Sequence, residues 1–315
     1  MRAPPLLAGF VALLACACRD APPLVSYAYD ATLTERLTPR DPAWPSACGR
    51  APDERIGLPE ALTRERSPLP VSPGFGADLA AAIDSLPRPF DRLFERHVCA
   101  VVLMHGAPMS GTLRTIAGDP SHALVFFDVK ALDRSANAWM AFKESSAFQL
   151  TEGRSLRGEL MAPRDDSRRA LLEFVLVHEL AHVADSTHLY DEWIEPFRQL
   201  SWPRGDALAK TPIVHYPERK SLPPLPASLL EPYFELMATG AFASPATLSN
   251  AEEDFADSVA TYVHTVIRGR PWRLGLYQSG ELVRQLNTCW DEPRCGPKRA
   301  LIERLLRRWG GKDGE

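Results

Sequence analysis

The sequence predicts an α+β fold, in which a few strands precede a long apolar helix and further helices follow it. Two β-rich runs, residues 99–104 and 123–129, are separated by the turn-forming residues Gly106, Pro108 and 118–120. Residues 167–184 are apolar almost throughout and contain no Gly or Pro, which predicts a buried helix capped by Asp166 or Ser167. Strands grouped before helices are typical of the α+β class.

The remaining elements and the domain limits follow from composition and periodicity. The 315 residues suffice for one large domain or two small ones, and a net charge of −4 gives no sign of a nucleic-acid partner. Residues 16–73 are rich in Pro and charge and predict a tether or a wrapped arm, so that the folded domain covers residues 74–315. Residues 190–250 predict loops and short helices. Further helices are expected over residues 77–85, 90–96, 251–268 and 298–309, of which the last is basic and amphipathic and should pack on the domain surface.

The N-terminus has the features of an export signal. Arg2 precedes an apolar run over residues 6–15 that is too short to span a bilayer, so residues 1–15 are interpreted as a signal peptide. The segment Leu-Leu-Ala-Cys at 13–16 resembles the cleavage box of bacterial lipoproteins, in which Cys16 would carry the lipid. The resemblance implies a protein anchored to a bacterial envelope membrane and facing the periplasm or the exterior. Plain secretion is the alternative, because Ala-Cys-Ala at 15–17 also fits a signal-peptidase site.

Export would permit disulfides between the remaining cysteines. Cys289 and Cys295 are separated by a short loop and are expected to form a local clasp. Cys48 and Cys99 would then tie the arm to the domain, although other pairings stay open. No CxxC pair is present, which argues against a structural zinc site, and Cys18 is left over beside the lipidated position.

The HExxH motif is the strongest functional signal in the chain. Residues four apart on a helix lie on one face, so His178 and His182 can present two imidazoles to a single Zn²⁺. Glu179 lies beside the first histidine, where it can reach water at the metal without binding the metal itself. Two satisfied core histidines with a buried ion pair would be the structural alternative, but that alternative does not explain the position of Glu179.

A catalytic zinc needs a third protein ligand, and two residues compete for this role. His188 has the ligand spacing of the metzincins, although this chain has Asp185 where that family has Gly. Glu253 begins an ExxxD segment in which Asp257 shares its helix face and could hold the outer nitrogen of a ligand histidine. Asp185 could act in the same way or mark the helix end. Glu253 is the preferred ligand.

The HExxH helix followed by the ExxxD helix resembles the gluzincin group of zinc peptidases, over about a tenth of the chain. The resemblance implies a zincin fold, with a small mixed sheet packed on the HExxH helix and a mainly helical C-terminal part. It also implies an edge strand that binds extended substrate, for which residues 123–129 are the candidate. In this reading zinc lowers the pKa of its water, Glu179 acts as general base, and a Tyr or His stabilises the oxyanion. Candidates for that last role are His215, Tyr216 and Tyr233; His264 is expected to be structural.

The sequence therefore predicts a zinc metallopeptidase of the bacterial envelope that acts on a peptide or protein substrate. A catalytically idle zinc-binding scaffold is one alternative, and a zinc amidase that acts on cell-wall peptides is another. The sequence does not predict the oligomeric state.

Overall fold

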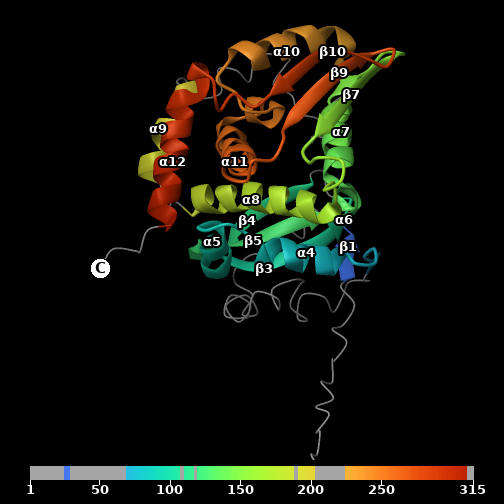
Figure 1. The fold of residues 1–315 in the computed structure, drawn as a ribbon. Helices are drawn as coiled ribbons and strands as arrows, with labels where there is room; N and C mark the ends of the chain where they lie inside the picture. The colour runs from blue at the N-terminus through green and yellow to red at the C-terminus, as the bar shows by residue number, and fades with distance from the viewer. Residues whose placement is uncertain are drawn as a thin grey trace, which may run out of the picture.

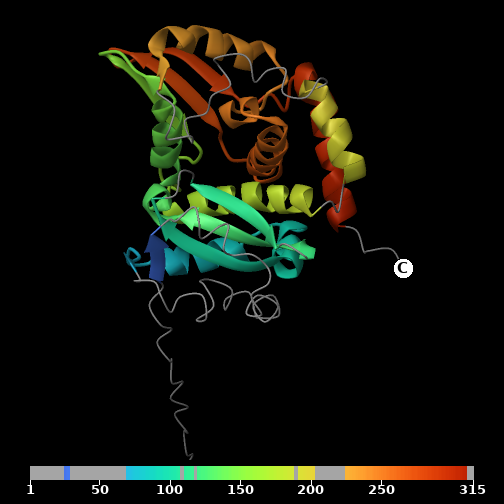
Figure 2. The same cartoon turned by 180° about the vertical axis from the view of Figure 1, so that it is seen from behind.

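The computed structural model describes residues 25–28, 69–106, 110–116, 119–187, 191–202 and 224–310. Figures 1 and 2 show two layers of structure with the long helix α8 (Arg168–Ser186) between them. One layer contains the larger β-sheet with two helices, and the other contains a smaller sheet with the remaining helices. The described chain is thus a mixed α+β protein with small sheets, as the order of its elements predicts.

The larger sheet has five strands in the order β2-β1-β3-β5-β4. Its strands are β1 (Val25–Ala28), β2 (Leu69–Pro70), β3 (Val98–His105), β4 (Gly111–Ile116) and β5 (Asp119–Asp128). The strands β1, β3 and β5 are parallel, whereas β2 and β4 run antiparallel to their neighbours. Two of the strands, β1 and β2, come from the segment before residue 74, so part of the predicted arm belongs to the sheet.

The structure corrects the expected edge strand. Residues 123–128 belong to β5, which is buried along this length and lies between β3 and β4. Continuous burial on both faces is typical of a central strand, and the near-continuous apolar run of β5 reflects it. The edge strand next to α8 is β4, which among the described strands pairs with β5 alone.

Helix α8 is buried almost all round because it has structure on both sides. Ser167 caps its N-terminus, where the hydroxyl accepts from the Ala170 amide at 3.2 Å. One side of α8 contacts β4 and β5 together with α4 (Phe75–Asp84) and α5 (Phe90–His97). Its other side contacts α11 (Ala251–Tyr262). An apolar surface almost all round is therefore what this position requires.

The second layer contains a sheet that the sequence analysis did not predict. Strand β7 (Arg154–Glu159) precedes α8, yet it pairs with β9 (Arg273–Gln278), and β10 (Glu281–Asn287) lies at the other edge. The described chain after α8 is mainly helical, as expected, but it also contributes β9 and β10 to this sheet. The short strands β6 (Phe148–Gln149) and β8 (Leu225–Pro226) form a separate pair.

The helices of this layer surround α11 and the small sheet. They are α7 (Ala136–Ser146), α9 (Asp191–Ser201), α10 (Leu230–Thr239) and α12 (Gly296–Gly310). The short helix α6 (Val129–Leu132) instead contacts β3, β5 and α8. Short helical turns are η4 (Ala227–Leu229), η5 (Pro245–Leu248) and η7 (Pro293–Cys295), and α11 continues as the π-helical turn η6 (Val263–Ile267). Within the described chain no helix combines the length and the apolar character that crossing a bilayer requires.

One disulfide and one buried ion pair hold the C-terminal helix in place. Cys289 and Cys295 form a disulfide with their Cα atoms 5.7 Å apart, just before α12. Lys298 of α12 is 1% exposed and binds both carboxylate oxygens of Asp254 at 2.6 Å. This helix therefore packs on the domain, as its amphipathic pattern predicts. Cys99 is also disulfide-bonded; its predicted partner Cys48 and the lipidation residue Cys16 lie outside the described residues.

Candidate metal centre

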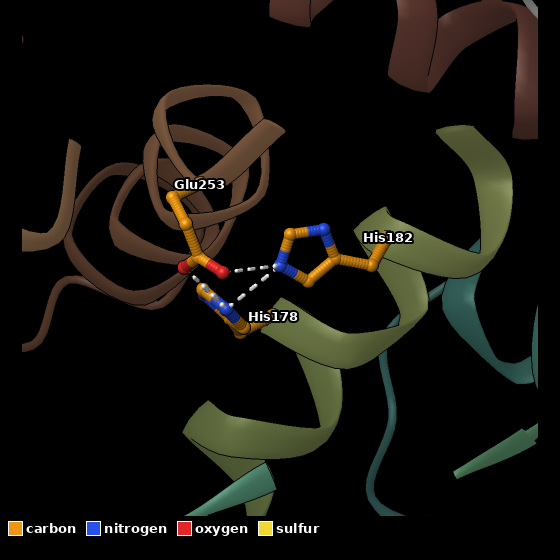
Figure 3. Close-up of side chains that lie close together, drawn as sticks. All are labelled: His178, His182 and Glu253. Atoms are coloured by element: carbon orange, nitrogen blue, oxygen red, sulfur yellow. Dashed lines mark hydrogen bonds and ion pairs between the residues drawn. The ribbon is translucent and has the colours of Figure 1, made fainter. Parts of the chain in front are cut away.

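Three side chains from α8 and α11 converge on one point. His178 and His182 lie one turn apart on α8, and Glu253 faces them from the first turn of α11 (Figure 3). The Glu253 carboxylate places Oε2 3.4 Å from Nε2 of His178 and Oε1 3.3 Å from Nε2 of His182. The two Nε2 atoms are 3.1 Å apart. The structure thus brings together the two histidines of the motif and the preferred third ligand.

The spacing of these donors fits a single tetrahedral zinc ion. Ligand atoms that each lie about 2 Å from a tetrahedral ion are roughly 3.3 Å from one another. The two histidine nitrogens, 3.1 Å apart, match this value, and each of them lies 3.3 or 3.4 Å from a different carboxylate oxygen of Glu253. One donor atom from each of the three residues lies within 4.8 Å of the others, which is close enough to hold one metal ion. Two imidazole nitrogens with one carboxylate oxygen also form the donor set of many catalytic zinc sites, in which the fourth position stays open. Among the described residues this is the one His, Cys, Asp and Glu cluster with metal-binding spacing.

The start of α11 holds Glu253 and Asp257 in position. Asn250 caps the helix and accepts from the Glu253 amide at 2.7 Å, which fixes the backbone of the predicted ligand. One turn later, Oδ1 of Asp257 lies 3.2 Å from Nδ1 of His178. The hydroxyl of Ser244 donates to the other oxygen of this carboxylate. Asp257 therefore orients the His178 ring so that its Nε2 faces Glu253, as expected for a residue behind a metal ligand.

The histidines and carboxylates at this point shift one another's pKa values. Burial lowers the pKa of His178, but hydrogen bonds to Asp257 and Glu253 outweigh it and hold that pKa well above its usual value. Burial raises the pKa of Glu253, yet His182 and His178 bring it well below its usual value. The pocket thus concentrates negative charge beside two imidazoles. A divalent cation can replace the proton that this arrangement attracts.

Glu179 is buried and directed at the cavity beside the metal-binding point. Its side chain is 3% exposed, and its Oε2 has no hydrogen-bond partner among the described residues. Burial raises the pKa of this carboxyl, although His178 and His182 oppose the effect. A buried carboxylate oxygen without a partner is costly, which indicates that it serves a ligand or a reaction.

The edge strand β4 approaches Glu179 so closely that a Cβ atom at its first residue would displace the Glu179 carboxylate. A Cβ atom added to Gly111 would lie 2.3 Å from Oε1 of Glu179. Gly111 and Ser110 line a cavity of about 310 Å³ together with His178, His182, Glu179 and Glu253. The cavity lies between β4, α7, α8 and the start of α11, so the metal-binding point opens onto the edge of the sheet.

Two of the predicted site residues have other roles in the structure. Tyr233 is 3% exposed and donates to Oε2 of Glu144 at 3.4 Å, and it is not among the residues that line the cavity. Its hydroxyl therefore faces Glu144 in this structure and does not face the metal-binding point. Asp185 accepts two hydrogen bonds of 2.7 Å from Arg198, so it ties the end of α8 to α9 and does not hold a ligand histidine.

The other candidates are either structural or outside the described chain. His264 is buried, and its Nε2 lies 2.7 Å from the Leu160 carbonyl and 3.1 Å from that of Pro271. Burial lowers its pKa to about 4, so this residue is neutral and structural, as expected. His188, the alternative third ligand, and the oxyanion candidates His215 and Tyr216 lie outside the described residues.

The sequence analysis missed several residues that line the cavity. Ser110 and Gly111 precede a short alternation of polar and apolar residues in β4, a period-two signal that could have predicted the strand. Trp139 and Lys143 lie on α7, and their spacing of four residues indicates one helix face. Nothing in the sequence placed that face at the metal centre. No family model, no curated protein and no solved structure matches this chain.

Proposed function

We propose that this protein is a zinc-dependent peptidase. One observation carries the proposal: Glu179, a buried carboxylate whose Oε2 has no hydrogen-bond partner among the described residues, borders the same cavity as three potential metal donors that lie within 4.8 Å of one another. A structural zinc site has no need of such a group, because closed sites use all four positions for protein ligands. The cavity, the donors and Glu179 together support hydrolysis over simple metal binding.

His178, His182 and Glu253 would hold the ion. When bound, zinc would supply a Lewis acid that polarises the peptide carbonyl and makes water more acidic. Glu179 takes a proton from the attacking water as the new C–O bond forms. It then returns this proton to the leaving nitrogen as the C–N bond breaks. The raised pKa of Glu179 suits a group that must both accept and donate a proton near neutral pH.

The edge strand β4 is the expected binding surface for the peptide backbone. An extended peptide can add to an exposed sheet edge through backbone hydrogen bonds, with its side chains in neighbouring pockets. Ser110, Gly111, Thr112, Leu113 and Thr115 of this segment all line the cavity. An extended peptide on β4 would thus pass directly in front of Glu179.

The decisive experiment compares the wild-type protein with Glu179→Gln on a defined peptide mixture, with cleavage followed by mass spectrometry. We expect the wild type to cleave when loaded with zinc, and Glu179→Gln to keep the metal but lose at least about 100-fold in kcat. Glu152→Gln, at an exposed turn before β7, is the matched control. If the zinc-loaded wild type cleaves neither these peptides nor cell-wall peptides, the peptidase proposal is refuted and the catalytically idle zinc-binding scaffold is the alternative that remains. Equal activity of Glu179→Gln would refute the assigned base.

The proposed place of action, outside the cytoplasmic membrane and attached through a lipid, rests on the first 18 residues alone. Cys16→Ser should abolish lipid labelling and membrane attachment in cell fractions. Unchanged attachment of that variant would refute the anchor.

A further inference from the structure

Helix α7 forms one end of the cavity. It lies beside the N-terminus of α8 (Figures 1 and 2). Trp139 and Lys143 of α7 line the cavity here, together with Phe174 of α8 and Ser110 at the start of β4. Phe174 precedes His178 by one helical turn, so this end lies beside the metal centre. None of these four residues takes part in the proposed proton transfers.

A hydrogen bond connects the two sides of the cavity at this end. Nε1 of Trp139 donates to the hydroxyl of Ser110 at 2.9 Å and so links α7 to the edge strand. The Trp139 ring is 4% exposed, and its centroid lies 6.1 Å from that of Phe174. A peptide that extends along β4 towards Ser110 therefore meets a wall of two packed aromatic rings.

Lys143 brings a positive charge to this wall. Its Nζ lies 5.1 Å from the centroid of the Trp139 ring, and its side chain is 13% exposed. Among the described residues that line the cavity, Lys143 is the one Lys or Arg, and the carboxylates of Glu179, Glu253 and Asp257 line the same cavity. The Glu144 carboxylate lies 4.0 Å from Nζ of Lys143, and its other oxygen accepts from the Tyr233 hydroxyl. An ammonium group has three donors and can contact more than one anion at a time.

The wall lies close to the metal centre on the scale of a peptide, because Phe174 and His178 line the same cavity one helical turn apart. The turn from Phe174 to His178 rises about 6 Å, whereas an extended peptide advances roughly 3.3 Å per residue. One or two residues thus fit between the hydrolysed bond and the wall.

We propose that Lys143 binds a substrate carboxylate beside the Trp139 and Phe174 rings, and that this carboxylate is the C-terminus of the peptide. The protein would then be an exopeptidase that releases the last one or two residues of its substrate. This inference rests on the proposed function and adds the class of substrate to it. A carboxylate could also come from an Asp or Glu side chain near the cleaved bond, and the experiment separates these two sources.

The test uses N-acetylated hexapeptides of Ala and Leu that differ only at the C-terminus. We expect the free acid to be cleaved at its last or second-last bond, with kcat/KM at least tenfold higher than for the C-terminal amide. A third peptide, an amide with Asp as its last residue, should behave as the plain amide. Cleavage of this third peptide as fast as the free acid would assign the site to an acidic side chain and overturn the C-terminal assignment. Equal cleavage of acid and amide at interior bonds would overturn the whole inference.

Two variants assign the preference to Lys143. Lys143→Met should remove the preference for the free acid, and Lys143→Arg should retain it. Lys130→Met, at an exposed position on α6, is the matched control and should behave as the wild type. A Lys143→Met protein that is folded and keeps the full preference would exclude this residue. The wild-type comparison of acid and amide decides the substrate class even if Lys143→Met is unstable.

A binding measurement separates this inference from the proposed function. Calorimetry on zinc-loaded Glu179→Gln should give at least tenfold tighter binding of the free acid than of the amide, without turnover. Selective binding by a wild type that cleaves nothing would leave the carboxylate site intact and refute the peptidase. If the wild type cleaves peptides but binds the free acid and the amide equally well, the peptidase proposal would stand and the carboxylate site would be refuted.

Discussion

The assignment of Glu253 as the third metal ligand makes the sharpest prediction, because its neighbour Glu252 provides a matched control on the same helix turn. Glu253→Gln keeps the shape of the side chain and removes its charge. Both carboxylate oxygens of Glu253 lie within 3.4 Å of the histidine nitrogens. Glu252 carries the same group, but its side chain is 57% exposed and lies 3.9 Å from Arg198.

The magnitude follows from the position of the carboxylate. Loss of a residue behind a metal ligand typically weakens metal binding by about 10–100-fold. Loss of a charged ligand itself should cost more, so we expect Glu253→Gln to weaken zinc binding by at least about 100-fold, or ~2.7 kcal/mol. The zinc-induced gain in the free energy of unfolding should fall by a similar amount at equal free zinc. Glu252→Gln should bind zinc as the wild type does.

Competition with a chromophoric chelator measures this affinity, and chemical unfolding with zinc or with EDTA measures the linked stability. A zinc dissociation constant of Glu253→Gln within about threefold of the wild-type value would refute the assignment. A tenfold change in this constant corresponds to about 1.4 kcal/mol. His188→Ala is the complementary variant, because His188 is the metzincin-type alternative. It should retain stoichiometric zinc; loss of zinc in this variant alone would replace Glu253 by His188.

Two further predictions concern Gly111 and His264. Gly111→Ala places a Cβ against the flexible end of Glu179, so zinc binding and folding should persist while kcat falls by about 100-fold. Gly296→Ala is the control and should have no effect, because nothing lies within 4 Å of the added Cβ. Full activity of Gly111→Ala in steady-state assays would show that Glu179 does not act from this position. Because the folded pKa of His264 lies near 4, below the reference 6.5, its neutral form stabilises the protein above about pH 6.5, and this stability is lost as the pH falls towards 4. Urea unfolding measures this at pH 7.5 and pH 5. Between these values the free energy of unfolding should fall by about 2 kcal/mol more in the wild type than in His264→Gln, whose side chain cannot be charged. Equal decreases in the two proteins would contradict the lowered pKa.

Local patterns in the sequence were sufficient for the helices that carry the site. His178 and His182 are four residues apart, as are Glu253 and Asp257, and helix geometry alone places each pair on one face. The helical signals over residues 167–184 and 251–268 are strong because hydrophobic periodicity and caps act within a few residues. These local rules therefore predicted the residues that the structure brings together, although no local rule shows that two helices about 70 residues apart in sequence must touch.

The order of strands and the walls of the cavity depended on tertiary structure. A strand such as β5 has the same local pattern whether it is central or at an edge, and only pairing with both β3 and β4 decides this. Likewise β7 finds its partner β9 more than 100 residues later. Tyr233 has the chemistry of an oxyanion stabiliser, but packing directs its hydroxyl to Glu144.

The sequence by itself thus determined the residues of the candidate metal site, because helical spacing translates directly into which side chains share a face. The tertiary structure alone decided the surroundings of that chemistry: the contact of Gly111 with Glu179, the link from Trp139 to Ser110, and the position of Lys143. Each of these joins elements that are distant in sequence. Their proximity follows from how sheets and helices bury their apolar faces together, which no local pattern encodes.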